Sequence, residues 1–592
     1  MSAKRPATIS EGLDYAAERY GERLAYVEGA RRITWGELRR RVREVAAGLI
    51  ASGFEKGDRA AICAENGIDW IVAYLAAVQA GGAGVLVYFD LKPREIEEQV
   101  RRPGSSRVLF VSKTVLEKLS PEPLAQRVVL LDDGGAEFEG VFGLDALAST
   151  ADEASRRELG ARTVAPDDLA AVIYTSGTTG GAKGVMLTHR NLMANAHAVL
   201  ATLDVSERDS VLLVLPLHHA LPFMATVLLP GLVGAHFVIE NDLRRIRDRL
   251  QEHRPTIFFG VPALYELMYQ NLLARAEAEG RLQALLAWQA RLRAIKKLTG
   301  LNLGPLVFRR IHKALGGRLR FLVSGGAALK PQTALDFFSL GLPLLQGWGM
   351  TEASPAIAVQ RFSRARFLFT RYYERHVGSV GAPLPGVELR LADVPEKDIF
   401  VSQGGEGEIL VRGENVFAGY WQAEEETRQA KPDGWLRTGD LGRFDAEGNV
   451  YLTGRSKSII VLDSGEKVYP DELEENLTES EIIQDVCVIG RGARGKTHVA
   501  AVVYASVEAA RLRAAEGGFS LDAASLRRLV EEEVDRLGRR LAAYKRVAQV
   551  ELADEPLPKT PLQKIARGRI AERYDFDFEK WLASATPAAG AK

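Results

Sequence analysis

A loop rich in hydroxyl groups and glycine, with one lysine, is the part of the sequence best suited to chemistry. It reads YTSGTTGGAKGVMLTH from Tyr174 to His189 and holds six Thr, Ser or His residues, four glycines and Lys183. Glycines let backbone N–H groups point at an anion, hydroxyl groups add donors, and a lysine supplies a mobile positive charge. This composition predicts that the loop binds a polyphosphate.

Two other interpretations of this loop compete with phosphate binding. The nucleotide-triphosphatase pattern G-x-x-x-x-G-K-[ST] does not fit, because the second glycine position, counted from Gly177, is Ala182, and Gly184 follows Lys183. The other alternative is a plain surface loop of small polar residues. We favour phosphate binding, because TSGTTG followed by KG is an unusual string for such a loop.

The segments on either side of the loop predict the elements that position it. The run LAAVIY, residues 169–174, has the length and the Val/Ile content of a buried strand. The run THRNLMANAHAVLATL begins with Thr188, a good N-cap, and continues with helical spacing. We therefore expect a strand, a glycine loop and a helix, an arrangement that makes a place for phosphate.

In the first two-fifths of the chain, alternating helix and strand patterns predict an α/β fold with parallel sheets. One amphipathic helix is expected to begin after Thr34 and end at Gly53, and Pro331 is expected to open another. After about Gly378, short alternating runs joined by Gly, Asp and Asn predict a mostly antiparallel region. The predicted fold is a large N-terminal domain of parallel and mixed sheets layered with helices, a β-rich subdomain, and a small mobile α+β C-terminal domain.

Length and composition narrow the class of protein. A chain of 592 residues is too long for one hydrophobic core, so two or more domains are expected. Lys plus Arg and Asp plus Glu both number 77, so the formal net charge is zero. The overall charge therefore gives no indication of a nucleic-acid partner. Cys63 and Cys487 lie in apolar runs and are expected to be buried thiols in a reducing compartment, and two cysteines cannot form a structural zinc site.

Two segments are candidates for contact with a membrane, one as a spanning helix and one as a peripheral surface. The N-terminus has no apolar signal core, and the uncharged run from Ala220 to Ile239 is interrupted by prolines, which favours a buried core or an apolar pocket wall and a cytoplasmic protein. Residues 281–320 carry ten Lys or Arg and no Asp or Glu, interleaved with Leu, Ile and Trp288. This segment either rests peripherally on an anionic membrane or forms a solvated helical hairpin packed on its domain, and we favour the hairpin. A homodimer also stays open.

Three later strings give the loop its context. They are LLQGWGMTEASP (344–355), WLRTGDLGRFDAEGNVYLTGRSKSIIVLDSGEKVYPDELE (435–474) and PLPKTPLQKIARGRI (556–570). In this order and spacing, the chain resembles the adenylate-forming (ANL) superfamily, which includes acyl-CoA synthetases, peptide-synthetase adenylation domains and firefly luciferase. It is most similar to AMP-forming long-chain fatty acyl-CoA synthetases, over about Ser10 to Tyr574. The resemblance implies that the protein uses ATP and Mg²⁺, with CoA as a co-substrate.

The resemblance also implies which residues bind the nucleotide and CoA. They are Thr175, Ser176, Gly177, Thr178, Thr179, Lys183, Gly325, Gly326, Ala327, Gly347, Trp348, Asp440, Arg455, Lys457 and Gly465. Asp440 would accept both ribose hydroxyls, although a turn-capping Asp is the ordinary alternative. Arg455 would reach the ribose or the α-phosphate, unless it only makes a surface salt bridge. Trp348 would offer a flat face to adenine, at a position where the family more often has Tyr or Phe.

The implied catalytic residues are Lys564, Thr351, Glu352 and His219, and the implied metal ligands are Glu352 and Thr175. A lysine between the reacting carboxylate and the α-phosphate lowers the barrier electrostatically, because both reactants are anions. Lys564 keeps the family register, although Gln563 replaces the usual glycine, and Lys559 is a nearby competitor. A glutamate is a hard oxygen ligand that suits Mg²⁺.

The resemblance divides the chain into an AMP- and acyl-binding domain, residues 1–454, and a mobile C-terminal domain, residues 455–592. Lys457 matches the hinge about which the small domain swings after adenylation. The turn LDSGEKVYP, with Gly465, would then cover the entry for the pantetheine arm of CoA.

The acid to be activated is predicted from the apolar segments. His219 resembles a residue that lines the acyl entrance, although an ordinary partly buried histidine fits equally well without the family. The apolar run behind it and FFGVPALYELMY would line a long alkyl pocket. We expect a long-chain-fatty-acid–CoA ligase. The alternatives are a fatty acyl-AMP ligase or carrier-protein loader, an aryl- or medium-chain-CoA ligase, and a nucleotide-binding scaffold without turnover.

Overall fold

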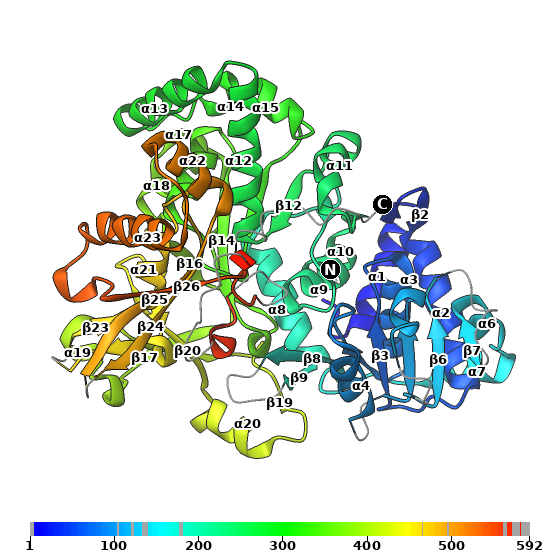
Figure 1. The fold of residues 1–592 in the computed structure, drawn as a ribbon. Helices are drawn as coiled ribbons and strands as arrows, with labels where there is room; N and C mark the ends of the chain where they lie inside the picture. Colours follow the sequence, from blue (N-terminus) through cyan, green and yellow to red (C-terminus); the bar gives the residue numbers. More distant parts are fainter. Residues whose placement is uncertain are drawn as a thin grey trace. The chain divides into compact units, whose positions relative to one another are not determined.

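The computed structural model describes residues 5–102, 106–119, 124–132, 140–176, 182–463, 466–493, 496–559, 565–570 and 580–581. The chain divides into two compact units. The larger consists of Met1–Leu389, Val411–Arg437 and Ala446–Val450, and the smaller of Arg390–Leu410, Thr438–Asp445 and Tyr451–Lys592. Both contain sheets and helices (Figure 1), so the predicted α/β class, with a large N-terminal part and a smaller C-terminal part, is confirmed.

An eight-stranded sheet in the larger unit carries the glycine loop. Its strands, in spatial order, are β19 (Gly419–Tyr420), β9 (Ala182–Thr188), β8 (Leu169–Ser176), β4 (Ala83–Leu86), β3 (Arg59–Cys63), β5 (Val108–Val111), β6 (Arg127–Leu130) and β7 (Val141–Gly143). The strands from β8 to β7 are parallel, as their continuous Val, Ile and Ala runs predict, whereas β9 and β19 are antiparallel to their neighbours.

A second sheet in the larger unit has a parallel centre. Its strands there are, in order, β16 (Ser379–Pro383), β15 (Ala356–Val359), β14 (Leu344–Gly349), β13 (Phe321–Ser324), β12 (Ile257–Gly260), β10 (Ser210–Leu213), β11 (His236–Ile239), β1 (Leu24–Glu28) and β2 (Arg31–Thr34). The strands from β14 to β1 are parallel. Because carboxyl ends of parallel strands meet at one edge, the segments after β13 and β14 lie side by side.

Helix boundaries follow the capping residues in the sequence. Helix α2 (Trp35–Ala51) begins after Thr34, which forms a capping box with Glu37. It ends shortly before Gly53, whose φ of +86° suits a residue without Cβ. Helix α16 (Pro331–Ser339) begins at the expected proline, and α8 (His189–Thr202) begins after Thr188.

The expected strand–loop–helix order around the glycine loop is wrong. The loop joins two antiparallel strands, β8 and β9, and α8 begins only after the seven residues of β9. The segment AKGVMLT forms a strand because it buries Gly184, Val185 and Leu187 against the sheet. The N-terminus of α8 therefore lies at the far end of β9 from the loop.

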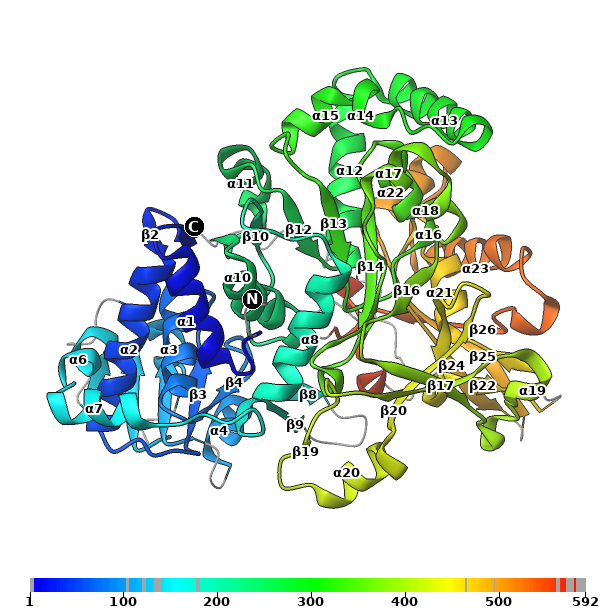
Figure 2. The same ribbon diagram turned by 180° about the vertical axis from the view of Figure 1, so that it is seen from behind.

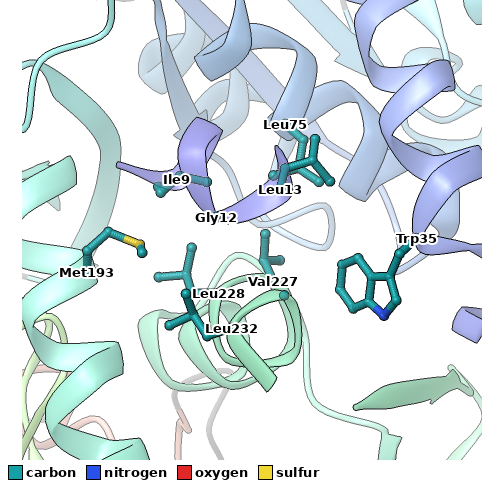
Figure 3. Close-up of a pocket in the computed structure, with 10 residues that line it drawn as sticks. Ile9, Gly12, Leu13, Trp35, Leu75, Met193, Val227, Leu228 and Leu232 are labelled. Carbon is teal, nitrogen blue, oxygen red and sulfur yellow. The ribbon is translucent and has the colours of Figure 1, made fainter. Parts of the chain in front are cut away.

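The uncharged run from Ala220 to Ile239 is a broken, buried helix followed by β11. It consists of α9 (Ala220–Phe223), a π-helical turn η1 (Met224–Leu228) and α10 (Leu229–Val233). Val227, Leu228 and Leu232 face an apolar cavity of about 20 Å³ whose other walls come from α1 (Ile9–Tyr20), α2, α3 (Ile68–Gln79) and α8 (Figure 3). The space suits about one water molecule, so it is not an open channel for an alkyl chain.

Helices lie on both sides of β12 in the sequence. Helix α11 (Ile246–His253) precedes that strand, and it is followed by α12 (Pro262–Ala278), α13 (Leu282–Thr299), α14 (Gly304–Val307) and α15 (Arg309–Ala314). Two short helices, α17 (Arg364–Phe369) and α18 (Tyr372–Arg375), follow β15. Helix α13 packs against α12 and α16 (Figure 2). It buries Leu285 and Leu292, so residues 281–320 include a helix packed on its domain.

The smaller unit holds most of four strands and two further small sheets. The four are, in order, β17 (Glu388–Ala392), β18 (Gly407–Arg412), β20 (Leu436–Phe444) and β21 (Val450–Arg455). A hairpin joins β22 (Ile460–Val461) to β23 (Lys467–Val468). A three-stranded sheet of β24 (Ile483–Ala493), β25 (Lys496–Ala505) and β26 (Gln549–Ala553) shares a core with α21 (Pro470–Leu477), α22 (Val507–Gly517) and α23 (Ala523–Gly538).

The structure also bears on the two cysteines and on membrane-spanning helices. Cys63 and Cys487 are free and buried, as expected. Among the helices of the described residues, none is both long enough and apolar enough to cross a membrane.

Candidate active site

The base of the glycine loop is defined by its two strands. Thr175 on β8 lies opposite Lys183 on β9, and the Thr175 hydroxyl donates to the Lys183 carbonyl at 3.5 Å. Gly177, Thr178 and Thr179 lie outside the described residues, as does the side chain of Ser176. The structure therefore places the predicted lysine and threonine at the mouth of the loop, and the roles of the other loop residues stay predictions.

Lys183 and Glu352 both lie next to Tyr420. The Lys183 Nζ lies 5.2 Å from the centre of the Tyr420 ring, close enough for a cation–π interaction. The Tyr420 hydroxyl donates to Glu352 Oε1 at 2.8 Å. Burial and the Glu352 carboxylate raise the pKa of Tyr420 well above its usual range, so this hydroxyl stays a donor. The loop lysine and the predicted metal ligand thus share one neighbour.

The segment with Thr351 and Glu352 is held by backbone contacts. Residues Thr351–Ala353 form a 3₁₀ turn, and the Phe417 N–H donates to the Glu352 carbonyl at 2.9 Å. Just before the turn, a Cβ on Gly349 would lie 1.9 Å from the Pro355 carbonyl oxygen, so only glycine fits there. The glutamate is 8% exposed, which sets its carboxylate in a largely dry environment.

Gly325 and Gly347 meet at the carboxyl ends of β13 and β14. A Cβ on Gly325 would lie 2.9 Å from the Leu221 side chain and 3.8 Å from the Gly347 carbonyl. Gly326, with a φ of +81°, is exposed, and Ala327 is half-buried. Trp348 is buried on β14, opposite Ala358. The structure thus brings the two predicted glycine segments together, beside α9 of the apolar run.

His219 belongs to a cluster of three rings at the start of α9. His218 stacks on Tyr88 with ring centres 4.3 Å apart, and the His218 and His219 ring centres lie 4.0 Å apart. Burial lowers the pKa of His219 to about 4 and that of His218 well below its usual range. Within the described part of the chain, neither Nε2 atom has a hydrogen-bond partner. Both imidazoles are therefore neutral near pH 7.

In the smaller unit, the predicted Asp440 and Arg455 form an ion pair. The Arg455 Nε lies 2.9 Å from Asp440 Oδ1. Asp440 is buried, whereas more than half of the Arg455 side chain is exposed, so the pair presents its guanidinium outward. Lys457 follows on an exposed 3₁₀ turn, and Gly465 lies outside the described residues.

Lys564 also lies outside the described residues, but residues on both sides of it in the sequence are described. Lys559 and Ile565 form an antiparallel bridge, and the Ala566 N–H donates to the Pro558 carbonyl at 2.7 Å. The competing Lys559 pairs with Asp485 at 2.6 Å. A structural ion pair thus accounts for Lys559.

Most of the chain matches known protein families. The AMP-binding enzyme family matches residues 13–421, and the AMP-binding enzyme C-terminal domain matches residues 457–585. A long-chain-fatty-acid–CoA ligase of Escherichia coli O157:H7 is 30% identical, with 97% of this chain and 95% of that protein aligned. One of Mycobacterium tuberculosis is 30% identical over 92% of each. The chain belongs to the AMP-binding enzyme family.

Solved structures agree with this assignment at the level of the fold. ATP-bound MatB from Rhodopseudomonas palustris aligns with a TM-score of 0.70 at 26% identity, covering 95% of this chain and 97% of that one. The anthranilate CoA ligase AuaEII, solved with anthranoyl-AMP, aligns with a TM-score of 0.74 at 22% identity, covering 96% and 98%. Family membership and the CoA ligases among the relatives indicate an AMP-forming acyl-CoA synthetase, a ligase.

Two residues of this AMP-binding enzyme, Tyr420 and Arg567, make contacts near the predicted site residues or motifs but are not among the residues predicted from the sequence. Tyr420 sits in FAGYW, where an aromatic pair after a glycine was a usable signal. Arg567, in the IARGRI string, donates to Asp471 at 2.7 Å, to Glu474 at 2.6 Å and to the Val488 carbonyl at 3.0 Å. Nothing in its local sequence indicates these partners, because all three lie on elements far away along the chain.

Proposed function

We propose that this AMP-binding enzyme is a long-chain-fatty-acid–CoA ligase. A carboxylate oxygen of the fatty acid attacks the α-phosphorus of ATP, and pyrophosphate leaves. The CoA thiolate then attacks the acyl carbon of the acyl-AMP, and AMP leaves. The observation that carries the proposal is the 30% identity to long-chain-fatty-acid–CoA ligases over nearly the whole length of both chains.

In the larger unit, we assign the phosphates to the loop and its lysine. Lys183 and Thr175 would bind phosphate oxygens together with the loop residues 176–179. The described residues contain no group of three or more His, Cys, Asp or Glu side chains that could hold a metal ion by themselves. Mg²⁺ is commonly held by one or two carboxylates plus substrate phosphates, and Glu352, oriented by Tyr420, fits that requirement. Bound Mg²⁺ would neutralise phosphate charge.

The adenosine and the carboxylate would approach the backbone closely at four small residues, Gly325, Gly326, Ala327 and Gly347. Trp348 would lie near the adenine. The close approach of Gly325 to Leu221 supports a place beside the apolar run. His219, neutral and buried at the start of α9, would face the acyl group. Since the cavity along this run is small, an acyl chain would have to displace side chains there.

In the smaller unit, Asp440 would accept the ribose hydroxyls and Arg455 would support it. Lys564 would stand between the carboxylate and the α-phosphate during adenylation. We keep the division into residues 1–454 and 455–592 with a hinge at Lys457, and Gly465 near the pantetheine arm, as part of the proposal. A cytoplasmic location suits the two buried free thiols.

Product identification by mass spectrometry tests the function. The protein would be incubated with ATP, Mg²⁺ and acids from acetate to palmitate plus benzoate, with and without CoA. We expect palmitoyl-CoA and AMP only when CoA is present. Acyl-AMP that accumulates regardless of CoA would instead show an acyl-AMP ligase, and benzoyl-CoA as the main product would show an aryl-CoA ligase.

A further inference from the structure

A buried asparagine, Asn66, supports the loop that leads to the two histidines at the start of α9. It lies between β3 and α3 and is 7% exposed. We propose that Asn66 is a positioning residue for activation of the acid, because it fixes the place of His218 and His219 beside the acyl group. This inference rests on the proposed function, which assigns His219 to the acyl entrance.

The Asn66 side chain makes two buried hydrogen bonds to the backbone of this loop. Its Nδ2 donates to the Leu215 carbonyl at 3.1 Å, and its Oδ1 accepts the Leu217 N–H at 2.8 Å. A primary amide carries a donor and an acceptor side by side, so it can pair with the C=O and the N–H of the two residues that flank Pro216. An aliphatic side chain makes neither bond, and a carboxylate can only accept.

The residues that Asn66 holds lead directly into the histidines. Leu217 precedes His218 in the chain, and the His219 N–H donates to the Pro216 carbonyl at 3.2 Å. The Phe223 N–H donates in turn to the His219 carbonyl at 3.0 Å, so the first turn of α9 continues from the loop. A shift of Leu217 would therefore displace both imidazoles.

Asn66 is itself held in place by neighbouring segments. Its carbonyl accepts a hydrogen bond from Asn241 Nδ2 at 2.9 Å, and Asn241 lies shortly after β11. The Ile68 N–H, at the start of α3, donates to Glu28 Oε2 on β1 at 3.0 Å. Asn66 thus connects the segment after β3, in the eight-stranded sheet, with the segments after β10 and β11 in the second sheet of the larger unit. The position of its amide is therefore fixed independently of any substrate.

The histidine pair has the features of a binding group that needs such support. His218 stacks on Tyr88, which follows β4, so a displaced loop would also lose this ring contact. The Nε2 atoms of His218 and His219 are buried and have no hydrogen-bond partner among the residues that the structure describes. Since buried polar atoms normally have a partner, these two nitrogens are available to a polar atom of the substrate. In the proposed reaction, that atom belongs to the acid.

Asn66→Ala and Asn66→Asp test this role in the full-length protein. The alanine variant loses both bonds, and the aspartate variant keeps an acceptor for the Leu217 N–H but cannot donate to the Leu215 carbonyl. ATP–pyrophosphate exchange would be measured with the acid, from acetate to palmitate or benzoate, that the wild-type protein adenylates fastest. We expect kcat/KM for the acid to fall roughly tenfold or more in both variants, while KM for ATP changes by less than about twofold.

Asn302, between α13 and α14, offers a matched control. It is 8% exposed, and its side chain donates to the Phe338 carbonyl at 3.1 Å and accepts the Gly304 N–H at 3.0 Å. Asn302→Ala and Asn302→Asp lose the same two kinds of bond, so they should lower the melting temperature to a similar extent but leave KM for both substrates unchanged. If the control variants lost as much kcat/KM for the acid as the Asn66 variants, the proposal would be overturned.

Hydrogen-exchange mass spectrometry measures the position of the loop without relying on activity. The backbone amides of residues 217–223 should exchange faster in Asn66→Ala than in the wild type or in Asn302→Ala. Asn241→Ala keeps both bonds of the Asn66 side chain, so it should raise KM for the acid by a smaller factor, and it serves as the test if Asn66→Ala does not fold. Unchanged exchange, or an equal loss for ATP and acid, would overturn the proposal. A wild-type protein that adenylates no acid would overturn the proposed function, and the exchange would still decide whether Asn66 holds the loop.

Discussion

At the scale of single residues, Tyr420 decides how the loop lysine and the predicted metal ligand are arranged. Its hydroxyl orients Glu352 and its ring faces Lys183, so one side chain supports two charged groups of opposite sign. Because burial and Glu352 keep the phenol protonated, the hydrogen bond persists at physiological pH. Tyr420 is therefore a positioning residue in our proposal.

Tyr420→Phe removes the hydroxyl and keeps the ring. A hydrogen bond to a charged group contributes about 1.5–3 kcal/mol, so we expect acyl-AMP formation to lose about tenfold or more in kcat/KM for ATP. The loss should shrink at high Mg²⁺, because a misoriented Glu352 weakens metal binding. ATP–pyrophosphate exchange at several Mg²⁺ concentrations measures this. An unchanged Mg²⁺ dependence would contradict the assigned role, and Tyr372→Phe, on α18, is the matched control.

Lys564→Ala should abolish acyl-AMP formation while leaving thioester formation from supplied acyl-AMP largely intact. The reason is that only the first step brings two anions together. Lys559→Ala is the control, because Lys559 is engaged with Asp485 and should mainly affect local stability. Equal loss of both half-reactions in Lys564→Ala would contradict the role of this lysine.

At the scale of elements, His189 connects α8 to the start of α1. It is the first residue of α8, and its Nδ1 accepts the Ile9 N–H at 3.2 Å, so this nitrogen carries no proton. Burial lowers the pKa of His189 to about 4. A histidine whose pKa is lower in the folded than in the unfolded state favours unfolding as the pH falls below about 6.5, because the unfolded chain then binds the extra proton.

The size of this effect can be predicted. Between about pH 7 and pH 5, the free energy of unfolding should fall by about 2 kcal/mol through His189 alone. His189→Gln keeps an acceptor for the Ile9 N–H but cannot titrate, so its stability should depend less on pH by that amount. Urea unfolding of both proteins at the two pH values measures the difference. Parallel pH profiles would show that His189 is not the group that titrates.

At the scale of the molecule, residues before the proposed hinge share a small core with residues after it. Val394, Ile399, Leu441 and Ile459 form one buried cluster within the smaller unit. The Lys397 ammonium group donates to the Ile459 carbonyl at 3.2 Å. The smaller unit therefore includes residues well before 457, where the C-terminal family match begins.

Ile399→Ala should loosen this cluster by about 2–4 kcal/mol, a typical cost for a buried isoleucine. The backbone amides from Ile459 to Tyr469 should then exchange with deuterium faster, although they are distant in sequence. Hydrogen-exchange mass spectrometry measures this, with the half-buried Val401→Ala as the control. Unchanged exchange after Ile459 would mean that the two segments open independently.

Much of the local structure could be predicted from the sequence. Thr34, Thr188 and Pro331 mark helix starts because capping depends on a few neighbouring residues. Apolar runs such as RAAIC predict buried parallel strands because burial on both faces requires them. The ordered motifs identify the family because their residue types are set by the chemistry of the bound groups.

The tertiary structure alone decided which residues meet. The segment AKGVMLT, expected to belong to the glycine loop, is a strand because its partners, β8 and β19, lie on either side of it in the sheet. The contacts of Tyr420 with Lys183 and Glu352, and of Arg567 with Asp471 and Glu474, join segments that no local pattern connects. Local preferences extend over a few residues, whereas such pairs form only when the folded chain brings distant segments together.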